Sequence, residues 1–197
     1  MRKAMIKRKT SETNIAVKLN LGGSGKSKIK TGIGFLDHML TLFAKHGLFD
    51  LEIKASGDLE VDRHHTNEDV GICLGQAFAK ALKDKKGISR YGFCFVPMDE
   101  SLANARVVLD ISARPSLYFN KPASIKGDCE GYNIQDAKEF FKAFAGNSGI
   151  NMHVDIIRGE DTHHIIEAVF KAFARAMKDA VKIDKRVKGV PSTKGKL

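Results

Sequence analysis

Apolar residues recur at every second position in several short stretches of the first half, a pattern typical of strands that bury one face. The alternation predicts strands over residues 2–9, 13–21, 48–55 and 59–62. Two longer stretches carry apolar residues at helical spacing and predict amphipathic helices over residues 32–46 and 67–85. The Gly22-Gly23-Ser24-Gly25 cluster lacks the Lys-Ser/Thr ending of a phosphate-binding P-loop and is interpreted as a hairpin loop.

The second half of the chain repeats this order of elements. It predicts strands over residues 91–97, 103–111 and 150–157, with helices over 135–145 and from His163 onward. The repetition indicates an internal duplication of a unit of strands and two helices. We therefore expect one α+β domain over residues 1–197, built from two pseudo-repeats (about 1–90 and 91–185) and a basic C-terminal tail. Helices should pack on one face of each sheet.

Two copies of a His-His-x-x-Glu motif stand at matching places in the two halves. The first is His64, His65 and Glu68, and the second, 99 residues later, is His163, His164 and Glu167. On a helix each Glu lies near both histidines, because neighbours along a helix face are three or four residues apart. The adjacent histidines diverge by about 100° at ~3.6 residues per turn. They suit two different metal ions, or one metal ion and a second ligand.

Polar residues are common in the first turn of a helix, so one such motif alone carries little weight. Its recurrence in duplicated halves favours metal binding, because surface histidines have no reason to recur in pairs. His38 is a further ligand candidate, and its counterpart in the second half is Glu139. Nitrogen and oxygen donors without sulfur suit an ion such as Mn²⁺ better than a structural zinc.

The net charge of +10 resides at the two ends of the chain. Residues 1–10 carry five basic side chains, residues 178–197 carry seven basic and two acidic ones, and the remainder is balanced. Nucleic-acid binders usually show a basic stripe over the folded surface instead. The three scattered cysteines argue against a disulfide framework. Because no apolar stretch is long enough to span a bilayer and no signal peptide is apparent, we expect a cytoplasmic protein.

Several basic and hydroxyl side chains suit a phosphate group. Arg90 and Arg114 stand at predicted element ends, where a lone arginine is usually only a solvated charge. Lys171 follows His163 by eight residues and therefore shares its helix face. The segment Pro191-Ser192-Thr193-Lys194-Gly195 offers hydroxyls and an ammonium group, although a tail of this composition is often disordered. His46 and His153 fit packed or hydrogen-bonded roles equally well.

The motifs closely resemble those of the imidazoleglycerol-phosphate dehydratase family. The matching stretches run in order along the whole chain: residues 8–13, 32–40, 64–69, Pro97-Met98-Asp99-Glu100, 163–173 and 190–195. The resemblance implies a duplicated fold like that of ribosomal-protein domains with a left-handed βαβ crossover. It also implies trimers that assemble into a cage of twenty-four subunits, with two Mn²⁺ ions per active site at subunit interfaces.

The resemblance also assigns roles to individual residues. Metal ligands would be His38, His64, His65, Glu68, Glu139, His163, His164 and Glu167. Many relatives carry His where this chain has Glu139. Substrate contacts would come from Glu12, His38, His46, His64, His65, Glu68, Arg90, Arg114, His163, Lys171, Ser192, Thr193 and Lys194. Catalytic roles would fall to Glu12, His65 and Glu167.

The implied reaction is the manganese-dependent dehydration of D-erythro-imidazole-glycerol phosphate to imidazole-acetol phosphate in histidine biosynthesis. No carbonyl activates the proton that leaves, so the imidazole ring must drive the elimination. Our hypothesis is a metal-bound imidazolate that expels the adjacent hydroxyl to give a diazafulvene. Glu12 would then move the proton needed to reach the enol. Alternative readings are an RNA- or ribosome-associated protein, which leaves the histidine motifs unexplained, and a hydrolase with a dinuclear metal site.

Overall fold

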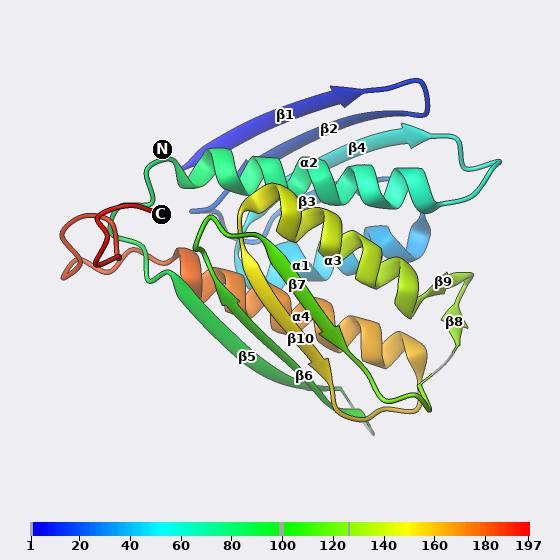
Figure 1. The fold of residues 1–197 in the computed structure, drawn as a ribbon. Coiled ribbons are helices and arrows are strands. Elements are labelled where there is room, and N and C mark those ends of the chain that lie inside the picture. The colour runs from blue at the N-terminus through cyan, green and yellow to red at the C-terminus, as the bar shows by residue number, and fades with distance from the viewer. Residues whose placement is uncertain (1, 99–100, 126) are drawn as a thin grey trace.

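The computed structural model describes residues 2–98, 101–125 and 127–197, which form two four-stranded sheets with four helices between them (Figure 1). The first sheet has the order β1 (Lys3–Lys9), β2 (Thr13–Asn20), β4 (Asp50–Gly57), β3 (Ser27–Lys30). The second has the order β5 (Tyr91–Met98), β6 (Ser101–Asp110), β10 (Asn151–Ile156), β7 (Ser116–Asn120). The helices are α1 (Gly34–Gly47), α2 (His64–Leu82), α3 (Ile134–Ser148) and α4 (Thr162–Val181).

The two halves have the same topology. In each sheet the first three strands pair antiparallel, and the fourth pairs parallel to the third through a helical connection. Each of the twelve buried positions of α2 falls on a buried position of α4 at an offset of 99. These observations confirm the predicted α+β fold with an internally duplicated unit. The second half adds a short hairpin before α3, formed by β8 (Asp128–Cys129) and β9 (Tyr132–Asn133).

Four phenylalanines, one from each helix, hold the two halves together at the centre of the core. Phe43 contacts Phe78 and Phe173, with ring centroids 5.9 and 4.8 Å away. Phe144 closes the ring, since its centroid lies 5.5 Å from that of Phe78 and 4.9 Å from that of Phe173. All four rings are fully buried. We call this group the phenylalanine ring. Offset and edge-to-face contacts of this kind stabilise a core beyond the area they bury.

Glycines allow α2 and α3 to approach closely. A Cβ atom on Gly71 would lie 2.7 Å from the carbonyl oxygen of Phe140, and one on Gly75 would lie 2.6 Å from that of Phe144. Such contacts are closer than packed atoms permit, so only glycine fits without movement. The spacing of four residues between the two glycines places both on the face of α2 that meets α3.

Three predictions about local structure were wrong or incomplete. Residues 59–62 form a turn in place of a strand, closed by a hydrogen bond of 2.9 Å from the Val61 N–H to the Asp58 carbonyl oxygen. The edge strands β3 and β7 were not predicted. The glycine-rich loop is not a hairpin, because β2 and β3 flank β4 on opposite sides. Asp50 at the start of β4 orders this loop by accepting backbone hydrogen bonds from Ser24 and Lys26.

No helix in the described ranges is long and apolar enough to cross a membrane. Two predicted motif residues, Asp99 and Glu100, lie outside the described residues.

Candidate active site and metal-binding cluster

Both histidine motifs lie at the N-terminal ends of long helices, at the same end of the molecule (Figure 1). Helix α4 begins where the Asp161 side chain accepts a hydrogen bond of 2.9 Å from the backbone N–H of His164. The adjacent imidazole rings diverge as the helical period predicts. Their planes differ by 69° for His64 and His65 and by 76° for the second pair. Each motif therefore presents its two imidazole rings in different directions.

One compact group of metal-ligand side chains joins α1 to α4. Nε2 of His38 and Nε2 of His163 each lie 3.2 Å from the same oxygen, Oε2 of Glu167. The ligand atoms of the three residues all lie within 4.8 Å of one another. Glu167 is buried, at 6% exposure, whereas the two imidazoles reach the surface. Two imidazole nitrogens and a carboxylate suit a divalent transition-metal ion, so the residues present fit such an ion.

Lys171 lies one turn further along α4, with Nζ 2.5 Å from Oε1 of Glu167. Burial raises the pKa of the Glu167 carboxyl, but the Lys171 ammonium and the hydrogen bonds from His38 and His163 outweigh it. The pKa of Glu167 therefore lies below its ordinary value. The carboxylate is held ionised, in the form that binds a cation.

The first motif is more open. Nε2 of His64 lies 3.8 Å from Oε1 of Glu68, and both side chains are more than a third exposed. Nδ1 of His65 lies 2.9 Å from Oδ2 of Asp58 and 3.9 Å from Oε2 of Glu12. The hydrogen bond to Asp58 raises the pKa of His65 above its ordinary value, and the Glu12 charge acts in the same direction. The predicted proton carrier Glu12 is therefore next to the predicted ligand His65.

Sequence reasoning missed two neighbours of the histidines. Asp58 follows β4 in a turn, and Cys129 lies on β8 with Sγ 3.5 Å from Nδ1 of His163. Contacts at one ring nitrogen orient the ring and leave the other nitrogen free to bind an ion. An acidic residue after a predicted strand was the only signal for Asp58, and no signal pointed to Cys129.

Two predicted site residues are not members of the His38–His163–Glu167 group. The Glu139 carboxylate contacts side chains of its own helix, accepting 2.6 Å from Gln135 Nε2 and 3.2 Å from Lys142 Nζ. His46 is half-buried near the end of α1. Its pKa is lowered by burial, and next by the positive charges of Lys171 and Arg175.

Most of the predicted phosphate-binding residues form a separate cleft, which we call the basic cleft, but Lys171 lies outside it and pairs with Glu167. The basic cleft has a volume of about 450 Å³, and its lining includes Arg90, Arg114, Ser192, Thr193 and Lys194. The tail contacts Arg90, whose Nη1 donates a hydrogen bond of 2.9 Å to the Pro191 carbonyl oxygen. Residues of the C-terminal tail line the basic cleft. This tail lies at the end of the molecule opposite the N-terminal ends of α2 and α4, which carry the histidine motifs (Figure 1). One chain therefore does not bring the two groups together.

Comparison with known proteins places these features in a family. The family model described as imidazoleglycerol-phosphate dehydratase matches residues 31–177. The proteins named imidazoleglycerol-phosphate dehydratase in Caldanaerobacter subterraneus subsp. tengcongensis and Acetivibrio thermocellus are 59% and 57% identical to this chain. The alignments cover all of this chain and 100% and 99% of those proteins, respectively.

Solved structures agree with this result. The crystal structure of imidazoleglycerol-phosphate dehydratase from Staphylococcus aureus is 42% identical, with a TM-score of 0.81 over 92% of this chain and 99% of that one. The enzyme from Pyrococcus furiosus in complex with (S)-C348 is 39% identical, with a TM-score of 0.82 over 98% of this chain and 100% of that one. On sequence and on fold, this chain belongs to the imidazoleglycerol-phosphate dehydratase family.

Proposed function

We propose that this protein dehydrates D-erythro-imidazole-glycerol phosphate to imidazole-acetol phosphate in histidine biosynthesis, in the cytoplasm and with Mn²⁺ as cofactor. The observation that carries the proposal is the convergence of His38, His163 and Glu167 in a chain of this family. The substrate combines an imidazole, which binds metal ions, with a phosphate, which the basic cleft suits.

Two ions per active site account for the divergent histidine pairs. His38, His163 and Glu167 would supply ligands for one ion, and the first motif would supply others through His64, His65 and Glu68. His164 and Glu139 complete the proposed set. When bound, the ions supply positive charge that stabilises negative charge on the substrate imidazole.

The remaining work falls to side chains of the protein. Glu12 carries the proton between the substrate carbon and the departing hydroxyl, and its position 3.9 Å from His65 supports this role. The water that leaves is made from that hydroxyl and a proton, and the enol that remains becomes the ketone. Lys171 holds Glu167 in place. Arg90, Arg114 and the tail residues Ser192, Thr193 and Lys194 hold the phosphate and fix the ring relative to Glu12.

We further propose that the active site is shared between copies of the chain. The histidine motifs and the basic cleft lie at opposite ends of one molecule, so a small substrate contacts both only where a second copy contributes one of them. Trimers assembled into a particle of twenty-four subunits are the form we propose.

A carbonyl-product assay on imidazole-glycerol phosphate tests the function. We expect product from the metal-loaded protein, none after chelation, and recovery when Mn²⁺ is restored. Release of inorganic phosphate in place of a carbonyl product would identify a hydrolase. No product with Mn²⁺ restored would refute the proposal.

Glu12→Gln tests the proton-transfer role. We expect turnover to fall by roughly 10²–10⁴-fold with metal content unchanged. Glu52→Gln is the matched control, because Glu52 is a half-exposed carboxylate paired with Lys18 on the first sheet. A near-normal rate for Glu12→Gln would exclude Glu12 as the acid/base group.

A further inference from the structure

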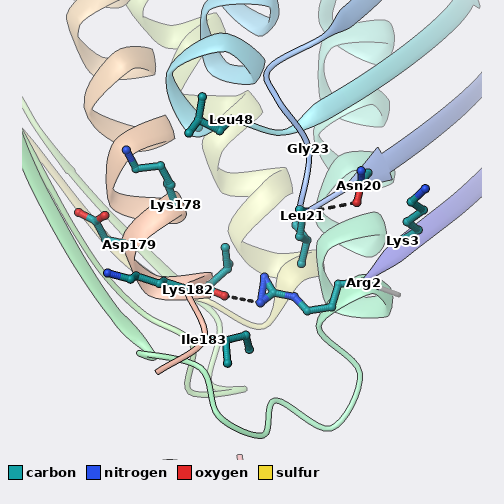
Figure 2. Close-up of a pocket in the computed structure, with 13 residues that line it drawn as sticks. Arg2, Lys3, Asn20, Leu21, Gly23, Leu48, Lys178, Asp179, Lys182 and Ile183 are labelled. Atoms are coloured by element: carbon teal, nitrogen blue, oxygen red, sulfur yellow. Dashed lines mark hydrogen bonds between the residues drawn. The ribbon is translucent and has the colours of Figure 1, made fainter. Parts of the chain in front are cut away.

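A second basic cleft lies where the start of β1 meets the end of α4 (Figure 2). It has a volume of about 890 Å³ and differs in its lining from the basic cleft described above. Four cations and one carboxylate line it: Arg2, Lys3, Lys178, Lys182 and Asp179. We call it the Arg2 cleft. None of these residues has a role in the proposed function.

Arg2 is the unusual group in this cleft. Its Nη1 donates a hydrogen bond of 2.6 Å to the Val181 carbonyl oxygen, but its Nε is buried and has no partner. Among the residues that the structure describes, no carboxylate forms an ion pair with Arg2. Burial lowers the pKa of its guanidinium. Because a part-buried charge without a counterion is costly, this guanidinium favours an anion from outside the chain.

The duplicated fold provides a comparison, because Arg90 holds the matching position in the second half. The carbonyl oxygen of Arg2 accepts from the N–H of Leu21, at 3.0 Å, as that of Arg90 accepts from the N–H of Ile111, at 3.1 Å. Arg90 is neutralised inside the chain by Asp110, with contacts of 2.6 and 3.0 Å.

The strand registers place Asn20 in the first sheet where Asp110 stands in the second, opposite Lys3 and Tyr91 respectively. An amide replaces the carboxylate, and the Asn20 Oδ1 accepts instead from the backbone N–H of Gly22 (Figure 2). Arg2 therefore keeps the positive charge that Asp110 neutralises at the matching residue, Arg90.

The rest of the lining favours a phosphate with an organic body. Lys178 and Lys182, at the end of α4, offset the negative end of that helix dipole. Leu48 and Ile183 are apolar and about half exposed, at 48% and 47%. Figure 2 shows the guanidinium of Arg2 between Leu21 and Ile183, so charge and apolar surface are adjacent. Excess positive charge and the forked donors of arginine suit a phosphate dianion better than a single carboxylate.

We propose that the Arg2 cleft binds a small phosphate ester, with the phosphate on Arg2 and the organic part against Ile183. This site is additional to the basic cleft that the proposed function assigns to the substrate phosphate. The contacts of Arg2 support this second site whether or not the basic cleft binds the substrate phosphate.

Equilibrium dialysis of the full chain with radiolabelled inorganic phosphate counts the sites. We expect two per chain in the unchanged protein, one in Arg114→Gln, one in Arg2→Gln and none when both are changed. Lys178→Gln should weaken the Arg2 site by about threefold, as expected for loss of one solvent-screened charge. Lys185→Gln removes the same charge from an exposed position outside the cleft and should leave both sites intact.

Circular dichroism of Arg2→Gln checks that loss of the hydrogen bond to Val181 has not unfolded the chain. Phosphate binding by Lys178→Gln tests the same site without changing Arg2. A single site, lost in Arg114→Gln and unaffected by Arg2→Gln and Lys178→Gln, would overturn the proposal. So would a crystal structure of the assembled protein in which a carboxylate of a neighbouring copy occupies Arg2. Failure of the proposed function would appear separately, as absence of product in the carbonyl-product assay with Mn²⁺ restored.

Discussion

Glu68 and Glu167 occupy matching positions in the two histidine motifs, yet their surroundings differ. Glu167 is buried between two imidazoles and the Lys171 ammonium. Glu68 is 36% exposed, and the residue that matches Lys171 at the offset of 99 is Ile72. Lys171 pairs with Glu167, whereas no lysine among the described residues pairs with Glu68. The two matching motifs therefore share residue types but differ in burial and in ion pairing.

Cys73 gives a prediction about pH. This thiol is fully buried in α2, and burial raises its pKa to about 11. A group whose pKa is higher in the folded state than in the unfolded chain costs stability as the pH rises between the two values. We expect the free energy of unfolding to fall between pH 9 and 11, by up to about 1.4 kcal/mol per pH unit. Urea unfolding across this range measures it.

Cys73→Ala is the control, because it removes the titrating group. Its stability should be lower at neutral pH, owing to lost packing, but should decline less steeply above pH 9. Parallel curves for the two proteins would contradict the assignment of this decline to Cys73.

At the residue scale, the sequence predicted those parts of the site that helical spacing places together. His163 and Glu167 are one turn apart on α4. His38 was a ligand candidate because its counterpart in the second half is Glu139. The sequence did not predict the contacts of Asp58 and Cys129 with the histidines. Each lies outside the helices, where spacing along the chain does not determine position in space. The contact between Lys171 and Glu167 was implicit in their four-residue spacing, but its effect on the carboxylate pKa depends on burial.

The close packing of α2 on α3 yields a prediction at the scale of elements. Gly71→Ala gains helix propensity of about 1 kcal/mol, but its Cβ would lie 2.7 Å from the Phe140 carbonyl oxygen. Overpacking of this kind costs about 1–3 kcal/mol, so we expect a net loss of stability in urea unfolding.

The matched control is Gly146→Ala on α3, where a Cβ meets nothing within 4 Å and the residue is exposed. This variant should be as stable as the parent or more stable, by up to about 1 kcal/mol. Equal destabilisation of both variants would show that backbone freedom, and not the helix contact, explains the glycines.

The two strands that were not predicted, β3 and β7, lie at sheet edges, and the wrongly predicted strand over residues 59–62 has no partner strand. β3 has a single apolar residue, Ile29, because an edge strand of four residues buries little surface. Its counterpart β7 is also a short edge strand, defined by its parallel pairing with β10. Residues 59–62 alternate Leu59 and Val61 with acidic residues, yet they pair with no neighbouring strand and both apolar side chains are exposed. Alternation predicts a strand only where a partner is present.

At the scale of the whole molecule, the separation of the histidine motifs from the basic cleft predicts that inactive chains can restore each other. Glu167→Gln damages one end and Arg114→Gln the other. If each active site takes one end from each of two copies, mixed oligomers contain some sites in which both ends are intact. Random pairing of equal amounts gives about a quarter of the sites intact. Activity after joint dissociation and reassembly measures this fraction.

Glu167→Gln mixed with His163→Asn is the control for that experiment. Both changes damage the same cluster, so no pairing should restore a site and activity should stay at the level of either variant alone. Verified mixed oligomers of Glu167→Gln and Arg114→Gln that remain inactive would show that one chain supplies a whole active site.

The phenylalanine ring has a consequence for the continuity of the chain. Phe43 and Phe78 precede the 83–87 loop, and Phe144 and Phe173 follow it. A polypeptide severed in that loop would leave two fragments, each exposing two of the four rings and the helix faces around them. We expect the fragments to co-purify as a one-to-one heterodimer when co-expressed, and to aggregate when expressed singly. In the intact chain this loop links the two halves, so their association is intramolecular and proceeds at an effective concentration of about millimolar order.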